Sequence, residues 1–176
     1  TINKNQPPSQ NQQVISPTPL PAETSVKEGD PTANWKTYTN EKYKFTLMYP
    51  PNLSYEEQIS DIFLFQITFQ DPTVKQQYLN NGFIVEIRNS NLEEEVEYIK
   101  WTIVGHLADK IKRQESISKN GYKGTKLVYD ILSEDKKEFT VIIFNNGKYS
   151  YSIEANSNLN DQILSAFKFS VQNQTQ

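Results

Sequence analysis

The 176-residue chain contains no cysteine and only one histidine. Without cysteine it can form no disulfide, no thiolate nucleophile, no Cys-ligated zinc site and no iron–sulfur cluster. The single histidine, His106, would have to serve any Ser-His-Asp catalysis, yet no Gly-x-Ser-x-Gly segment and no second metal ligand at a suitable spacing accompany it. No isolated pair of acidic residues has a spacing typical of carboxylate catalysis. We therefore predict a surface or helix-end role for His106, a protein that is not an enzyme, and no metal or cofactor.

Long apolar runs and a basic stripe are missing as well. No run of 18 apolar residues occurs, so the chain as given spans no membrane. The 18 basic residues are spread singly or in pairs against 21 acidic ones, which gives a net charge of −3 and argues against nucleic acid as a partner. The chain starts at Thr1, so we expect either that a leader or anchor was removed or that this is a fragment. Any membrane attachment is expected only through such a removed N-terminal anchor.

Residues 1–33 differ in composition from the rest of the chain. They hold six of the nine prolines, many Gln, Asn, Ser and Thr residues, and no aromatic residue. Such a segment cannot pack a core, and its prolines favour extended polyproline II geometry. We predict a disordered, semi-stiff tether over 1–33, a globular domain over 34–170 and a short disordered tail over 171–176. The alternative, an incidental disordered tail with no spacer role, stays open.

Alternating apolar residues after Trp35 predict strands. Large side chains at 43, 45, 47 and 49 form one face of a strand that ends at Pro50-Pro51. A second strand is predicted over 62–69, with its first half covered on both sides, and a third over 83–88. Four further strands are predicted as an antiparallel meander over residues 113–119, 122–132, 138–145 and 148–155. Asn120-Gly121 and Asn146-Gly147 are typical of two-residue type I′ turns between such strands.

Two segments have helical periodicity instead. Ser90 or Asn91 can cap a helix that extends to about Ala108, with an apolar stripe at Leu92, Val96, Ile99 and Ile103. Glu93 and Glu94 lie in the first turn of this helix, where the helix dipole favours negative charge. The acidic run at 93, 94, 95 and 97 is read as a solvated helix face rather than as a calcium site, because 93, 94 and 97 lie away from the apolar stripe. Ser157 or Asn158 caps a last helix, whose stripe is Leu159, Ile163, Leu164 and Phe167. The fold class is therefore α+β: a central antiparallel sheet flanked by helices, with any uncovered sheet face solvated or partnered.

These elements carry a family resemblance. The chain has Trp35-x-x-Tyr38, a strand ending in Tyr49-Pro50, a helix near Gly105, a Gly121-Tyr122 hairpin and a closing Ile163-Leu-x-x-Phe167-x-Phe169. Together they resemble the PsbP-like family, in particular its bacterial envelope lipoproteins, over residues 34–170. The sequence departs from the family pattern at Lys44 and at Pro51.

The resemblance implies an α/β/α sandwich that serves as an accessory or scaffold domain and binds another macromolecule. Its photosynthetic members are extrinsic photosystem subunits in the thylakoid lumen, others are lipid-anchored, and one eukaryotic relative of the fold binds a small GTPase. No catalytic residue and no cofactor carries over from the family.

Tyrosine and tryptophan side chains are the remaining candidates for a site. We predict a partner-binding surface of Tyr122, Tyr149, Tyr151 and Trp101, because such residues are enriched at interfaces; the alternative is that they fill the core. The predicted function is a monomeric, non-enzymatic, extracytoplasmic domain that is anchored to the membrane or envelope and recognises an envelope protein. A second hypothesis is a carrier that holds a small apolar ligand or cell-wall fragment between sheet and helix, in a pocket lined by Phe63, Phe65, Val96 and Ile103.

Overall fold

The computed structural model describes residues 32–74, 82–119, 121–132 and 137–169. These residues belong to one compact unit that begins at Pro31. The predicted tether (apart from its last two residues), the predicted C-terminal tail and Asn120 of the first predicted turn lie outside the described residues.

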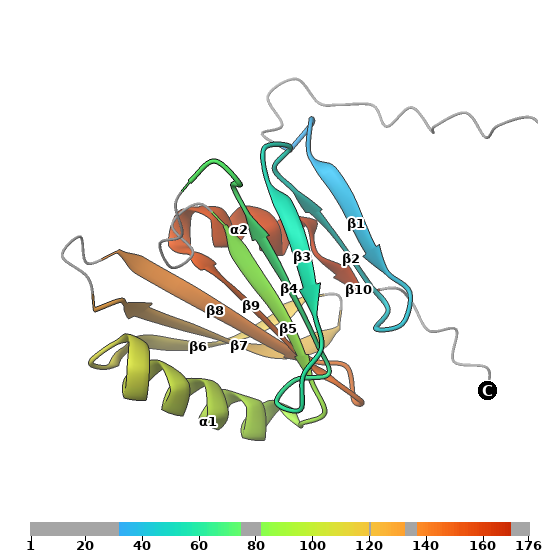
Figure 1. Cartoon of the computed structure of the whole chain (residues 1–176). Coiled ribbons are helices and arrows are strands. Elements are labelled where there is room, and N and C mark those ends of the chain that lie inside the picture. Colours follow the sequence, from blue (N-terminus) through green and yellow to red (C-terminus); the bar gives the residue numbers. More distant parts are fainter. Residues whose placement is uncertain (1–31, 75–81, 120, 133–136, 170–176) are drawn as a thin grey trace, which may run out of the picture. The chain divides into compact units, whose positions relative to one another are not determined.

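Seven antiparallel strands form the larger of two sheets, in the order β3-β4-β5-β9-β8-β7-β6 (Figure 1). Their bounds are β3 Ser54–Gln58, β4 Phe65–Gln70, β5 Phe83–Arg88, β6 Ile111–Lys119, β7 Tyr122–Asp130, β8 Glu138–Asn145 and β9 Ser150–Asn156. Each of β6, β7 and β8 pairs with the strand that follows it in the chain. The predicted meander of the second half is thus confirmed.

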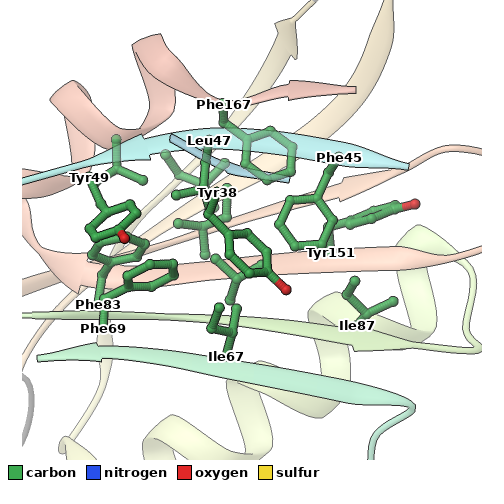
Figure 2. Close-up of a cluster of buried hydrophobic side chains, with 14 of the residues drawn as sticks. Tyr38, Phe45, Leu47, Tyr49, Ile67, Phe69, Phe83, Ile87, Tyr151 and Phe167 are labelled. Carbon is green, nitrogen blue, oxygen red and sulfur yellow. The ribbon is translucent and has the colours of Figure 1, made fainter. Parts of the chain in front are cut away.

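A smaller sheet of three strands, β1 (Lys36–Asn40), β2 (Phe45–Tyr49) and β10 (Lys168–Phe169), packs on one face of the larger one. Figure 2 shows the side chains that fill the space between the two sheets. The labelled ones include Tyr38, Phe45, Leu47 and Tyr49 from the small sheet and Ile67, Phe69, Phe83, Ile87 and Tyr151 from the large one. Helix α2 (Ser157–Ala166) adds Ile163 to this core, and Phe167, the residue that caps its C-terminal end, packs there as well.

This arrangement corrects the predicted α/β/α sandwich. One face of the central sheet is covered chiefly by a second sheet, so the fold is richer in sheet than a helix-flanked sandwich. The α+β class and the central antiparallel sheet are confirmed. Strand β1 escaped prediction because Tyr38 is the single buried residue among its five.

The opposite face is covered by helix α1 (Leu92–Thr102) and the π-helical turn η1 (Ile103–Leu107) (Figure 1). Asn91 caps α1 in a capping box with Glu94, and Val96 and Ile103 point into a second core against β7 and β8. The predicted helix is confirmed, but regular α-helix ends at Thr102. A single π turn then completes it, with the Ala108 N–H donating to the Ile103 carbonyl at 2.9 Å.

Local hydrogen bonds explain where strand and cap predictions failed. The Ser60 hydroxyl accepts from the N–H groups of Ile62 and Phe63, which bends the chain and leaves Ile62 63% exposed. The predicted two-sided cover of this segment is therefore wrong, and β4 starts only at Phe65. Likewise α2 is capped by Asn156, one residue before the predicted Ser157.

The second predicted turn is shifted by one residue. The Asn146 N–H donates to the Tyr149 carbonyl, so the two central residues are Gly147 and Lys148. Gly147 has φ +88°, whereas Asn146 keeps a negative φ and uses its side-chain oxygen to accept from the N–H groups of Lys148 and Tyr149. Asn146 therefore precedes the two central residues of the turn and stabilises the turn through its side-chain oxygen.

Candidate binding surface on helix α1

Tyr151, one of the four predicted partner-binding residues, is buried in the core between the two sheets. Its hydroxyl donates to the Tyr43 carbonyl at 2.8 Å and accepts from the Asn146 side-chain amide at 2.7 Å. Burial raises the pKa of this phenol. In the folded protein Tyr151 ties the β8–β9 hairpin to the start of β2, and it is not accessible to a partner.

Tyr122 and Tyr149 lie half-buried against the same core. The ring of Tyr122 is 4.3 Å from that of Phe169, and the ring of Tyr149 meets that of Tyr43 edge-on at 5.5 Å. The structure therefore gathers the three predicted tyrosines on the side of the small sheet. The predicted set does not form one surface, because Trp101 belongs to the helix on the opposite face.

Trp101 is 66% exposed, although it is one of the two largest apolar side chains in the protein. The inward residues of α1 and η1 are Val96, Ile99 and Ile103, and the helical period turns Trp101 away from them. Its ring lies 6.4 Å from that of Tyr98 and meets the ring of His106 edge-on at 5.6 Å. His106 is exposed in η1, which confirms the predicted surface position.

Two more exposed apolar side chains lie at the same end of the helix. Val104 is 47% exposed and sits one turn after Trp101. Leu132 is 63% exposed and follows β7, where its N–H donates to the Leu107 carbonyl at 2.8 Å. We call the group Tyr98, Trp101, Val104, His106 and Leu132 the α1 surface. Apolar side chains that gather on a surface are typical of binding sites.

A pocket of about 250 Å³ lies between α1 and the large sheet. Its floor comes from β4, β5, β8 and β9, and its wall from α1 and η1. The pairing register explains the floor: Glu86 stands opposite both Gln66 and Ser152, and Glu154 stands opposite both Ile84 and Val141. The helix contributes Tyr98, Ile99, Thr102, Ile103 and Leu107.

Carboxylates dominate the electrostatics of this region. Glu86 accepts from the Gln66 amide at 3.0 Å and pairs with the Arg88 guanidinium at 3.4 Å. The same guanidinium pairs with Glu95 at 3.3 Å and lies 3.8 Å from the centroid of the Tyr98 ring. Glu154 accepts a hydrogen bond from the Tyr129 hydroxyl. Arg88 thus contributes one positive charge against the three carboxylates of Glu86, Glu95 and Glu154.

Glu95 differs from its acidic neighbours. It is 1% exposed, whereas Glu93, Glu94 and Glu97 face solvent as predicted for the acidic run. Burial raises the pKa of Glu95, and the Ser90 hydroxyl at 2.7 Å and the Arg88 guanidinium oppose that shift. This buried ion pair was not predicted from the sequence. One feature of the sequence could have indicated it: Arg88 is a charged residue at the end of a strand with alternating buried residues, shortly before the acidic start of the helix.

The predicted carrier pocket is not formed. Phe65 belongs to the core against the small sheet, whereas Val96 belongs to the core under α1, so the large sheet separates them. Of the four predicted lining residues, Ile103 alone lines the pocket under α1. The volume of that pocket is also below the roughly 300–1,000 Å³ of small-molecule sites.

Among the described residues no helix is long and apolar enough to cross a membrane, and no three His, Asp or Glu residues are placed to hold a metal ion.

Comparison with known proteins gives matches in structure only. No protein-family model and no curated protein sequence matches the chain. The solved structure of cyanobacterial PsbP (CyanoP) from Synechocystis sp. PCC 6803 matches with a TM-score of 0.57 and 13% identity, over 82% of this chain and 97% of that one. The Ran-binding protein Mog1p from Saccharomyces cerevisiae matches with a TM-score of 0.47 and 10% identity, over 78% of this chain and 96% of that one. The first likeness shows the fold, and the second is too low to support an inference.

Proposed function

We propose that this chain, whose fold is PsbP-like, is a non-catalytic extracytoplasmic domain that binds another protein of the cell envelope through the α1 surface. The observation that carries the proposal is the exposure of Trp101 and, one turn later, of Val104 on the helix. The exposed Leu132 is held by its backbone against the end of η1. Of the four residues predicted from the sequence, Trp101 keeps its assignment as a central contact. Tyr122 and Tyr149 stay as peripheral candidates on the other side of the domain, and Tyr151 is withdrawn because it is buried.

The size of the exposed tryptophan supports a protein partner. A tryptophan side chain can bury about 150–250 Å², so covering its exposed two thirds removes roughly 100–165 Å² from water. At about 25 cal/mol per Å² this contributes about 3 kcal/mol to binding. A single contact of that size is typical of a binding hot spot.

The proposed location depends on the tether. Residues 1–33 are rich in proline and polar residues, a composition suited to a spacer between an anchor and a folded domain. An envelope anchor followed by such a spacer would hold the α1 surface clear of the membrane. Fractionation of the native cells tests this part, because recovery of the protein in the cytosol would contradict it.

A quantitative pull-down tests the binding function. The full chain would be crosslinked to solubilised envelopes of the native cells as wild type, as Trp101→Ala and as Ile62→Ala. Ile62 is a matched control, because it is 63% exposed and apolar but lies in the segment before β4. We expect one protein to be enriched by wild type and by Ile62→Ala and to fall about 100-fold with Trp101→Ala, from the 3 kcal/mol above. Equal capture by all three forms would refute the proposed surface, and recovery of lipid or glycan without protein would refute a protein partner.

A further inference from the structure

Ser152 stands out among the polar residues of the pocket under α1. It is 5% exposed, it lines the pocket, and its hydroxyl makes no hydrogen bond with any of the described residues. Its neighbour Ser150 on the same face is also buried, but the hydroxyl of Ser150 donates to the Ser90 carbonyl at 3.0 Å. Buried hydroxyls are nearly always hydrogen-bonded, so an unused one that faces a pocket points to a bound polar group.

The carboxylate oxygens near Ser152 indicate that the bound polar group is positively charged. Glu86 lies directly opposite Ser152 in the register of β5 and β9, and Glu154 lies two residues further along the same face of β9. All three side chains line the pocket. Glu86 and Glu154 both line the pocket, and no lysine or arginine is among its described lining residues. A cation that donates hydrogen bonds fits these acceptors, whereas an anion would be repelled.

The pocket also has an apolar wall. Ile99, Ile103 and Leu107 come from the helix side, and Ile84 and Val141 come from the sheet. An apolar wall beside a cluster of oxygens matches an alkyl stem that ends in a charge. The volume of about 250 Å³ is suited to one long side chain rather than to a lipid or a glycan.

We propose that the pocket receives a lysine side chain of the protein that covers the α1 surface. Its ammonium group would donate to Glu86, Glu154 and Ser152, and its methylene stem would lie along the apolar wall. An ammonium group has three donors on one compact centre, whereas the flat fork of arginine needs an open carboxylate edge, and that of Glu86 is already taken by Gln66 and Arg88.

Tyr98 connects this pocket with Trp101. The tyrosine lines the pocket, and its ring lies 6.4 Å from the tryptophan ring. One partner segment can therefore cover Trp101 and insert a lysine beside it. The inference rests on the proposed function, since it names the chemistry that the partner presents to the same surface.

Nuclear magnetic resonance titration of the full chain tests the inference without the partner. The probe is Nα-acetyl-lysine methylamide, and its matched control is Nα-acetyl-norleucine methylamide, which has a similar stem and no ammonium group. We expect the lysine probe to shift the amide signals of Glu86, Ser152 and Glu154 saturably in the millimolar range, and the norleucine probe to leave them in place. Equal shifts with both probes, or no shift with either, would overturn the inference.

Three variants sharpen the test. Ser152→Ala removes a hydroxyl that has no partner in the protein, so it should fold normally and weaken the lysine probe about tenfold. Glu154→Gln should weaken it at least tenfold, while Glu93→Gln, which removes the same charge from the exposed side of α1, should leave the affinity within about twofold. Unchanged affinity in Ser152→Ala and Glu154→Gln would contradict the pocket assignment.

Two further outcomes separate this inference from the proposed function. Loss of the envelope partner in Trp101→Ala together with full capture by Glu154→Gln would leave the function standing and refute the lysine pocket. Binding of free putrescine more than about 100-fold tighter than the lysine probe would also refute it, because the site would then serve a small diamine instead of a partner side chain.

Discussion

The Tyr151 hydroxyl provides a direct test of the core because it joins parts of the chain that are distant in sequence. Tyr151→Phe removes the oxygen and keeps the ring that packs against Phe45, Phe167 and Phe169. The Tyr43 carbonyl then loses a buried hydrogen-bond partner, and the partly exposed Asn146 amide loses its partner as well. Leaving a buried polar group unsatisfied costs about 1–3 kcal/mol.

The matched control is Tyr149→Phe. Tyr149 is two residues away and half-buried, and its hydroxyl makes no hydrogen bond with the described residues. We expect Tyr151→Phe to lower the free energy of unfolding in urea by about 2 kcal/mol, which is roughly 4–8 °C in Tm for a domain of this size, and Tyr149→Phe to change it by less than about 0.5 kcal/mol. A normal stability in Tyr151→Phe, or an equal loss in both variants, would refute the assignment of Tyr151 as a core tether.

Four other substitutions test local features by urea unfolding. Asn91→Ala removes the α1 cap and should destabilise the fold by about 1 kcal/mol; no change would contradict the capping box. Gly124→Ala should cost roughly 1–3 kcal/mol, since an added Cβ would lie 2.5 Å from the Ile143 carbonyl oxygen, and a neutral effect would contradict this close approach. Because burial raises the pKa of Glu95, its contribution to stability should fall as pH rises above the ordinary glutamate value of 4.5. Glu95→Gln should lack that part of the pH dependence, and parallel pH profiles of the two proteins would refute it. Trp101→Ala should change stability by less than about 0.5 kcal/mol, and a large loss would show a structural role.

The elements that could be predicted from sequence are those with one buried and one polar face. Strands β2 and β5 alternate between buried and partly exposed residues along their whole length. Helix α1 combines a capping asparagine with a regular stripe, so its start was also predicted. By contrast, all five residues of β3 are exposed and β10 has two residues, so neither carries a periodic signal.

The candidate site was harder to predict, because the sequence does not show which face of the large sheet the small sheet covers and which face helix α1 covers. Tyr151 and Trp101 are both large aromatic residues with polar neighbours in the sequence. In the structure Tyr151 is buried under the small sheet, whereas Trp101 faces solvent. The pocket was missed for a different reason. Glu86 and Ser152 meet only through the pairing of β5 with β9, two strands that the helix and the meander separate in the chain.

Site-specific photo-crosslinking tests whether the α1 surface binds a protein of the envelope. A benzophenone side chain would replace Val104 in the full chain expressed in the native cells, which leaves Trp101 in place, and the same group at position 62 would serve as the exposed control. We expect one discrete protein adduct from position 104 and none from position 62. Adducts from both positions, or from position 62 alone, would contradict the proposed surface.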